Sequence, residues 1–220
     1  YPLSLHDALP ILLALKINGI TFKNPIMVAS GTYGYGNEVS DFVDLSKFGA
    51  IITKSVTRNP REGNPPPRIF EVSSGMLNSI GLANLGVEKY IDEKIPYLNK
   101  IDTNVIINIA GTRINDYVET LEMLDNADSN HIGYEINISC PNVKEGGMEF
   151  GVSPDMTLKL TQELRARTEK ILIMKLSPNV TSVADIGLAA QKGGADAVST
   201  INTVMGMSVD INTKKPRLST

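Results

Sequence analysis

The 220-residue chain has no tryptophan, one cysteine and two histidines, and only 5% of its residues are aromatic. A single cysteine excludes an internal disulfide and fits a reducing compartment. The shortage of aromatic rings argues against a surface that stacks nucleic-acid bases. No basic block stands out, and the net charge is −3. We therefore expect neither a nucleic acid nor an anionic membrane as a partner.

No apolar run approaches the roughly 18 residues that a membrane-spanning helix needs. The short run at 9–15 has no basic stretch before it and no clear cleavage site after it, so we expect no secretory signal and a cytoplasmic protein. Residues 1–11 look foreign to the rest of the chain and resemble translated adapter sequence. We expect them to be an artefactual leader, followed by one domain over 12–220.

Short apolar runs alternate with helical patterns along this domain. Residues 13–22 predict a β-hairpin, because two alternating runs flank Asn18-Gly19. The predicted strands are continuous apolar runs, as in strands buried on both faces, at 26–30, 50–55, 105–109, 133–138, 171–176 and 197–201. Helices are predicted at 115–125 with Asn115 as N-cap, from Ser153 onward, and at 182–192. This repetition predicts an α/β fold of parallel βαβ units.

One long stretch, residues 57–86, interrupts the alternation and is rich in proline and glycine. Loops of this length inside a compact α/β domain are usually functional or disordered. Because the stretch carries Ile69, Phe70, Met76 and Leu77, we predict an ordered cap over a site.

Polar residues stand at the carboxyl end of every predicted strand. In chain order they are Ser30-Gly31, Lys54-Ser55, Asn108, Asn137 to Asn142, Lys175 and Asn202-Thr203. Parallel α/β barrels gather these ends on one face, which holds the active site. Lysine is almost never fully buried without a partner. The set therefore predicts a polar ligand of anionic character, held among amide groups.

Cys140 is the best-placed group in this set to accept a proton. His131 precedes its strand, His6 lies in the leader, and we expect no carboxylate at the strand ends. A thiol titrates near ~8.5, so nearby cations or backbone donors would have to help it at neutral pH.

Plainer interpretations of the single residues stay open. Cys140 also fits a buried packing position, and Asn142 a turn. Lys54 also fits a lysine that reaches solvent along an apolar surface. Gly193-Gly194 fits a helix C-cap better than a phosphate loop.

Taken together, these segments resemble the class 1 dihydroorotate dehydrogenases, which are FMN-dependent (β/α)8 barrels of pyrimidine synthesis. The resemblance rests on Ala29-Ser30-Gly31, Ile52-Thr53-Lys54-Ser55, Asn78-Ser79-Ile80-Gly81-Leu82, Asn108, Asn137-Ile138-Ser139-Cys140-Pro141-Asn142, Lys175-Leu176-Ser177-Pro178-Asn179 and Asn202-Thr203. It implies an FMN site lined by Ser30, Gly31, Lys54, Ser55, Asn108, Asn137, Lys175 and Ile201. It implies a dihydroorotate site formed by Lys54, Asn78, Ser79, Ile80, Gly81, Leu82, Asn137, Asn142, Asn202 and Thr203, with no metal.

The resemblance also implies the chemistry: the thiol at Cys140 removes the C5 proton of (S)-dihydroorotate while hydride leaves C6 for flavin N5, giving orotate. Cysteine at this position differs from the serine of the membrane-associated class 2 enzymes. Residues 63–68 and 75–78 look like the NAD-linked 1B form. In that form FAD and a 2Fe-2S cluster sit on a separate electron-transfer subunit, so a homodimer or heterotetramer is expected.

Six strands are visible where a complete barrel has eight. We therefore expect a C-terminally truncated barrel that retains no flavin through purification. The open alternatives are a related FMN barrel, such as dihydropyrimidine dehydrogenase or tRNA-dihydrouridine synthase, and a phosphate-binding barrel lyase with a structural Cys140.

Overall fold

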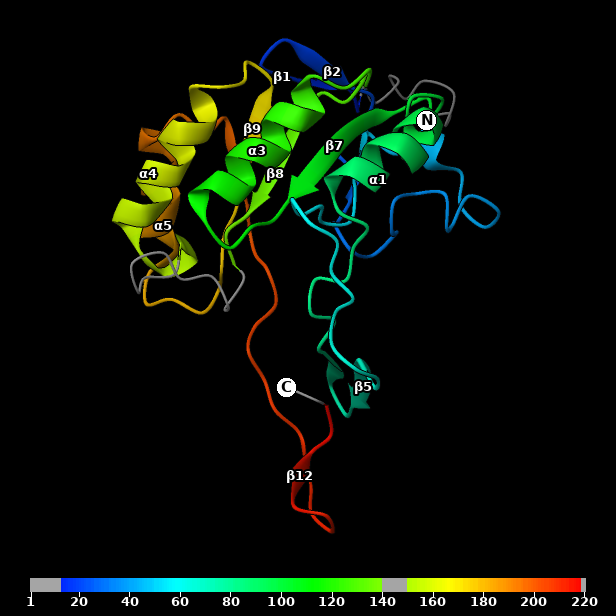
Figure 1. The fold of residues 1–220 in the computed structure, drawn as a ribbon, viewed down its shortest axis with the longest axis vertical. Coiled ribbons are helices and arrows are strands. Elements are labelled where there is room, and N and C mark those ends of the chain that lie inside the picture. Colours follow the sequence, from blue (N-terminus) through cyan, green and yellow to red (C-terminus); the bar gives the residue numbers. More distant parts are fainter. Residues whose placement is uncertain (1–12, 140–149, 219–220) are drawn as a thin grey trace, which may run out of the picture.

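The computed structural model describes residues 13–139 and 150–218. Its centre is a six-stranded sheet in the order β10-β9-β8-β7-β4-β3, in which all neighbouring strands are parallel. The strands are β3 (Met27–Val28), β4 (Ala50–Ile52), β7 (Asn104–Ile109), β8 (Gly133–Asn137), β9 (Ile171–Lys175) and β10 (Ala197–Ser199). The sheet curls like part of a barrel wall, with helices along its outer face (Figure 1). The predicted α/β barrel class is confirmed, and each predicted strand is present with shorter or shifted ends.

The helices begin and end at recognisable signals. They are α1 (Val87–Glu93), α2 (Ile95–Leu98), α3 (Ile114–Asp125), α4 (Pro154–Arg165) and α5 (Val183–Lys192), with short 3-10 turns η2 (Leu45–Lys47) and η3 (Phe150–Val152). Ser153 caps α4 through its side-chain oxygen and Gly193 ends α5, as predicted, while Ser182, expected as the first residue of the third helix, caps α5. The N-cap predicted for α3 is wrong. Arg113 holds that position, because the Asp116 carboxylate accepts the backbone N–H of Arg113 at 3.0 Å. The helices α1 and α2 were not predicted.

Side chains alternate between the two faces of the sheet. Ile107, Tyr134 and Leu172 belong to the large core shared with the helices, while Ile106 and Ile171 belong to a smaller cluster on the inner face. Both faces are thus buried over much of each strand, which explains the nearly continuous apolar runs in the sequence.

A hairpin packs against the amino-terminal part of the inner face. It consists of β1 (Leu15–Ile17) and β2 (Ile20–Phe22). Asn18 and Gly19 turn the chain with φ of 47° and 79°, as the Asn-Gly signal predicted. The buried Phe22 ring joins the inner apolar cluster. This end of the partial barrel is therefore filled by apolar side chains.

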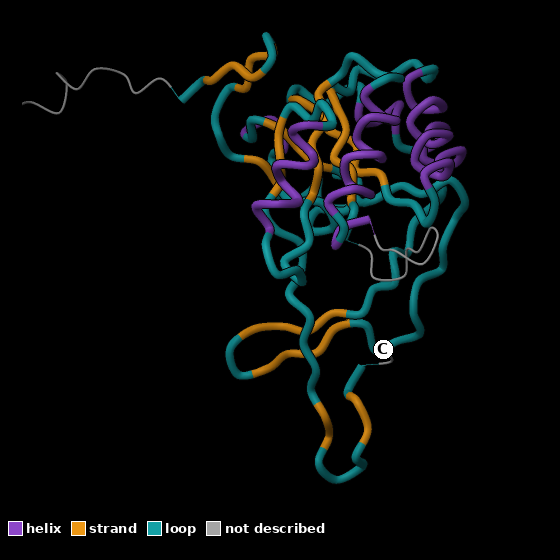
Figure 2. The backbone as a smooth tube through the Cα atoms, turned by 90° about the vertical axis from the view of Figure 1, so that its left-hand side faces the viewer, coloured by secondary structure: helices purple, strands orange, loops and turns teal. Residues whose placement is uncertain are grey.

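Two further hairpins project beyond the carboxyl ends of the strands (Figures 1 and 2). The first is formed by β5 (Ile69–Val72) and β6 (Gly75–Asn78), and the second by β11 (Val209–Asp210) and β12 (Lys215–Pro216). The Arg217 guanidinium lies 4.9 Å from the centre of the Phe70 ring and links the two. The stretch 57–86 is therefore ordered, as predicted, and its role as a cap stays a prediction. Within the described ranges, no helix has the length and apolar character needed to cross a bilayer.

Candidate active site at the carboxyl ends of the strands

Four polar side chains from four different strands or strand ends meet on the inner face of the sheet. We call Ser30, Asn108, Glu135 and Lys175 the inner polar cluster. The Lys175 ammonium donates to Ser30 Oγ at 2.9 Å and lies 3.7 Å from Glu135 Oε2. The Asn108 amide nitrogen donates to Glu135 Oε2 at 2.5 Å and to Ser30 Oγ at 3.3 Å. The parallel strands thus bring together residues up to 145 positions apart in the chain.

Glu135 is a residue of this cluster that the sequence analysis did not identify. It lies in the middle of β8 rather than at a strand end, is 1% exposed and contacts both Asn108 and Lys175. Glu135 was not identified as a site residue because residues 133–138 were expected to form a continuous apolar strand. The available signal was the period of two, which places Gly133, Glu135 and Asn137 on the same face.

A second polar group lies beside the first at the ends of β8 and β10. Asn202 donates from its amide nitrogen to Asn137 Oδ1 at 3.1 Å, and the Ser139 backbone N–H donates to the same oxygen at 3.2 Å. The Tyr117 hydroxyl on α3 donates to the Asn137 carbonyl oxygen at 2.9 Å. Ser139 Oγ donates to the Lys175 carbonyl oxygen at 3.2 Å, which ties β8 to β9 where both strands end.

The other predicted site residues follow the carboxyl ends of the strands and differ in how exposed they are. Lys54 and Ser55 follow β4 and are partly buried, and the Lys54 backbone N–H donates to the Gly34 carbonyl oxygen at 2.8 Å. Gly31, Ile201 and Thr203 are exposed.

The segment expected to face substrate comes from a different element. Asn78 is exposed at the end of β6, and Ser79 is buried with its hydroxyl accepting from the Asn64 amide at 2.8 Å. Ile80, Gly81 and Leu82 come next and are partly buried. That this segment and the inner polar cluster enclose one ligand stays a prediction.

Cys140 and Asn142 lie outside the described residues. The chain reaches them from Ser139, whose backbone N–H and hydroxyl are both hydrogen-bonded at the end of β8. Their predicted roles therefore stay predictions.

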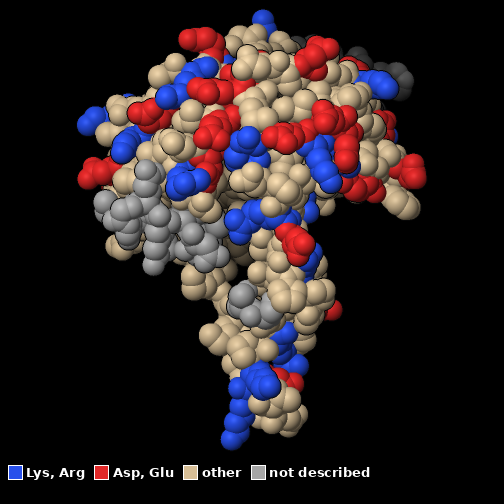
Figure 3. Space-filling model, viewed as in Figure 1, with Lys and Arg blue, Asp and Glu red and all other residues tan. Residues whose placement is uncertain are grey.

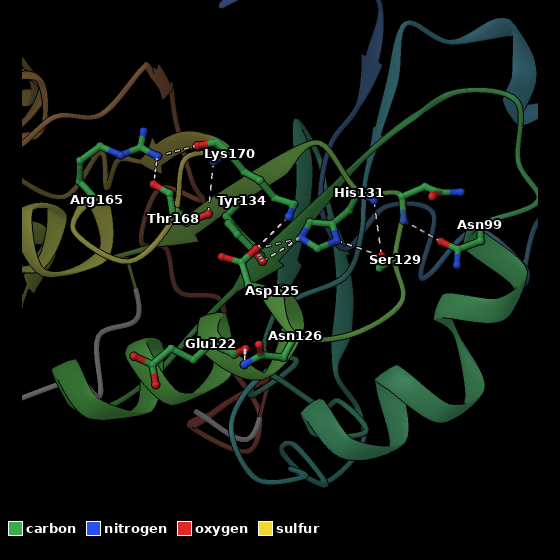
Figure 4. Close-up of polar contacts among 11 residues, drawn as sticks. Asn99, Glu122, Asp125, Asn126, Ser129, His131, Tyr134, Arg165, Thr168 and Lys170 are labelled. Carbon is green, nitrogen blue, oxygen red and sulfur yellow. Dashed lines mark hydrogen bonds and ion pairs between the residues drawn. The ribbon is translucent and has the colours of Figure 1, made fainter.

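The buried histidine sits at the opposite end of the sheet, as the sequence indicated. His131 precedes β8 and forms a chain of contacts with Ser129, Tyr134, Asp125 and Lys170 (Figure 4). Burial, and then the nearby Lys170 ammonium, lower the pKa of His131 from 6.5 to about 4. Burial alone would raise the pKa of Asp125, but hydrogen bonds from Tyr134 and Lys170 outweigh it and lower that pKa. This network is far from the inner polar cluster in the fold and supplies no base to it.

Comparison with known proteins decides the family. The family profile described as "Dihydroorotate dehydrogenase" matches residues 12–220. The chain belongs to this family. A similar protein from Bacteroides thetaiotaomicron is 49% identical over 208 residues, which are 94% of this chain and 68% of the relative. A protein from Thermoanaerobacter pseudethanolicus is 47% identical over 204 residues, covering 93% of this chain and 67% of the relative. Both relatives are named "Dihydroorotate dehydrogenase B (NAD(+)), catalytic subunit".

The inner polar cluster of this dihydroorotate dehydrogenase family member fits a flavin ring. A flavin edge carries alternating N–H and C=O groups, so it needs both donors and acceptors. Lys175 supplies a buried cation. Asn108 Oδ1 is a buried acceptor with no hydrogen-bond partner among the described residues, and such atoms are rare without a ligand or water. The residues present therefore suit the cofactor that the resemblance implied.

Other parts of the molecule present a surface of mixed charge and a hollow near the His131 network. On the face shown in Figure 3, acidic and basic side chains are interspersed over the rounded body of the molecule. A hollow of about 440 Å³ is lined by Asn18, Asp125 and Lys170, near the His131 network. Within the part of the chain that the structure describes, no group of His, Cys, Asp and Glu is arranged to hold a metal ion.

Proposed function

We propose that this protein oxidises (S)-dihydroorotate to orotate in pyrimidine biosynthesis, with FMN bound over the inner polar cluster and NAD as final acceptor. The observation that carries the proposal is the buried Asn108 Oδ1, which has no hydrogen-bond partner among the described residues and lies in the same cluster as the Lys175 ammonium, at the carboxyl edge of a barrel sheet. Family membership supports the reaction, and the names of the relatives support the acceptor. A cytoplasmic location stays a prediction.

The inner polar cluster binds and orients the cofactor in this proposal. Lys175 and Asn108 contact the ring as donor and acceptor, and Ser30 holds the Lys175 ammonium in place at 2.9 Å. Gly31, Lys54, Ser55, Asn137 and Ile201 complete the lining. Bound FMN supplies the hydride acceptor for C6 of the substrate.

The substrate lies between this lining and the segment Asn78 to Leu82. Asn202 and Thr203, which follow β10, and Asn137 of β8 contact it in this proposal, as does Asn142, which lies outside the described residues. Amides present both donors and acceptors, which matches a ring of alternating N–H and C=O groups. Lys54 balances the substrate carboxylate.

Cys140 acts as the base that removes the C5 proton. Support comes from its position directly after Ser139, which is anchored at the end of β8, and from the placement of His131 at the other end of the sheet. Glu135 is the one carboxylate found in the inner polar cluster, and it is already engaged by Asn108 and Lys175.

Electrons leave FMN through a partner in this proposal. The relatives' name "catalytic subunit" supports a second subunit. We infer that this partner carries FAD and a 2Fe-2S cluster, and that the assembly is a homodimer or a heterotetramer with it.

The test monitors flavin absorbance after dihydroorotate is added anaerobically to the protein with excess FMN. We expect bleaching in the wild type and a rate about 10² to 10⁴ lower in Cys140→Ala, the usual contribution of a general base. Cys140→Ala should bind FMN as the wild type does, which separates chemistry from binding. Bleaching by dihydrouracil in preference to dihydroorotate, or a Cys140→Ala rate equal to wild type, would contradict the proposal.

A further inference from the structure

Glu135 is a buried carboxylate that neither the cofactor lining nor the proton transfer uses. It is 1% exposed in the middle of β8 and lies directly opposite Asn108 in the register of β7 and β8. An ionised carboxylate taken out of water loses several kcal/mol of solvation, roughly, and a buried ion pair is weak evidence for stability. An apolar side chain, as at the paired position Ile173 on β9, would suit the packing. Stability alone therefore does not explain the presence of Glu135.

The contact between Glu135 and Asn108 fixes the orientation of the Asn108 amide. An ionised carboxylate only accepts hydrogen bonds, so it must face the nitrogen of the amide and cannot face the oxygen. The nitrogen donates to Glu135 Oε2 at 2.5 Å and to Ser30 Oγ at 3.3 Å. Both amide protons are then engaged, and Oδ1 is left as a buried acceptor without a partner among the described residues.

The same carboxylate also balances a charge. Lys175 is 8% exposed, and its ammonium lies 3.7 Å from Glu135 Oε2. A cation buried without a counter-charge is strongly unfavourable. The pair leaves Lys175 hydrogen-bonded to Ser30 and able to approach a ligand, while the net charge of the inner polar cluster stays near neutral.

We propose that Glu135 is a positioning residue of the flavin site: it holds Asn108 with its carbonyl oxygen free for a ring N–H and holds Lys175 beside it. Glu135 does not touch the ligand and acts through its two neighbours. This inference rests on the proposed function, because the ligand is FMN. It also predicts a property of the protein without FMN, namely the fixed orientation of the Asn108 amide.

The first experiment is a double-mutant cycle on the dissociation constant for FMN, measured by fluorescence titration. We expect Glu135→Gln to raise Kd at least tenfold, because the Gln amide allows Asn108 to turn over and present a donor. In an Asn108→Ala background the same substitution should raise Kd by a clearly smaller factor, and the remainder is the part that acts through Lys175. Glu169→Gln, an exposed glutamate in the loop before β9, is the matched control and should bind as wild type. A Glu135→Gln variant with wild-type Kd, or one whose full effect persists in Asn108→Ala, would overturn the proposal.

The second experiment covers the case in which Glu135→Gln fails to fold. Glu135→Asp keeps the charge for Lys175 but withdraws the carboxylate from Asn108, so we expect a folded protein that loses the part of the FMN affinity that depends on Asn108. Wild-type affinity in Glu135→Asp would contradict the orienting role.

The third measurement separates this inference from the proposed function. The side-chain amide resonances of Asn108, recorded by NMR without FMN, should move in Glu135→Asp and stay in place in Glu169→Gln. If wild-type protein binds no FMN, the proposed function is wrong, and only the Asn108 resonances then test the role of Glu135. If the Asn108 resonances do not move in Glu135→Asp, the proposed role of Glu135 is wrong, while FMN binding and flavin reduction still test the proposed function.

Discussion

Acidification below about pH 6.5 should destabilise this protein through one buried histidine. His131 is buried, and its pKa is lowered from 6.5 to about 4 by burial and then by the Lys170 ammonium. Tyr134 donates its hydroxyl proton to Asp125, so its oxygen accepts from His131 Nε2, and Ser129 donates to Nδ1. The network therefore suits neutral His131 with its proton on Nε2.

The sign is set by proton counts. Between pH 6.5 and about 4 the unfolded chain binds a proton at His131 that the folded chain does not, so the free energy of unfolding falls as pH falls through this window. At about 1.4 kcal/mol per pH unit, the full loss is about 3 kcal/mol, of which about 2 kcal/mol is reached at pH 5. The His131 side chain is 1% exposed, so solvent screening reduces this figure little.

Urea unfolding at pH 7.5 and pH 5 measures the effect. We expect the wild type to lose about 2 kcal/mol between the two conditions, and His131→Gln, which keeps a donor and an acceptor without titrating, to lose much less. An NMR titration in a His6→Gln background should show the remaining ring protonating near pH 4. Equal unfolding free energies at both pH values, or the same pH dependence in His131→Gln, would refute the assignment.

Two further predictions concern stability. Leu121→Ala on α3 removes a fully buried side chain and should lower the free energy of unfolding in urea by about 2–5 kcal/mol. The control Leu188→Ala changes an exposed leucine on α5 and should lower it by less than about 0.5 kcal/mol. Similar losses in the two variants would mean that α3 does not pack as described. Ser153→Ala removes the side-chain oxygen that accepts the Met156 backbone N–H and should lower the free energy of unfolding by about 1 kcal/mol. The control Ser153→Thr keeps a hydroxyl at this position and should retain most of the stability. An unchanged free energy of unfolding in Ser153→Ala would show that the cap is not formed.

Local signals predicted the local structure well. The Asn18-Gly19 hairpin, the Ser153 cap and the Gly193 helix end all depend on residues within a few positions of one another. The start of α3 was also readable, since Asp116 stands three residues after Arg113. It was missed because Asn115, a common capping residue, stands within the helix.

The site was only partly predictable, because its contacts depend on register between strands. Asn108 and Lys175 were identified as strand-end residues, but their meeting through Glu135 requires the pairing of β7 with β8 and of β8 with β9. That register is set by packing of the helices and hairpin over long sequence separations. A glutamate inside an apolar run gives little local sign that a lysine 40 residues further on balances it.

The inner face of the sheet is apolar near the amino-terminal ends of the strands and polar near their carboxyl ends. We expect the apolar part to contribute mainly to stability and the polar part mainly to ligand binding. Ile106 and Ile171 pack with Phe22 in an apolar layer closed by the first hairpin. Further along the same strands, Asn108 and Lys175 replace them with polar groups. Burying polar groups is unfavourable unless they are paired. The free energy gained by packing the apolar layer therefore offsets the cost of burying the polar layer. Substitutions in the first layer should therefore change unfolding free energy with little change in FMN affinity per folded molecule, whereas substitutions in the second should lower FMN affinity even in variants that fold.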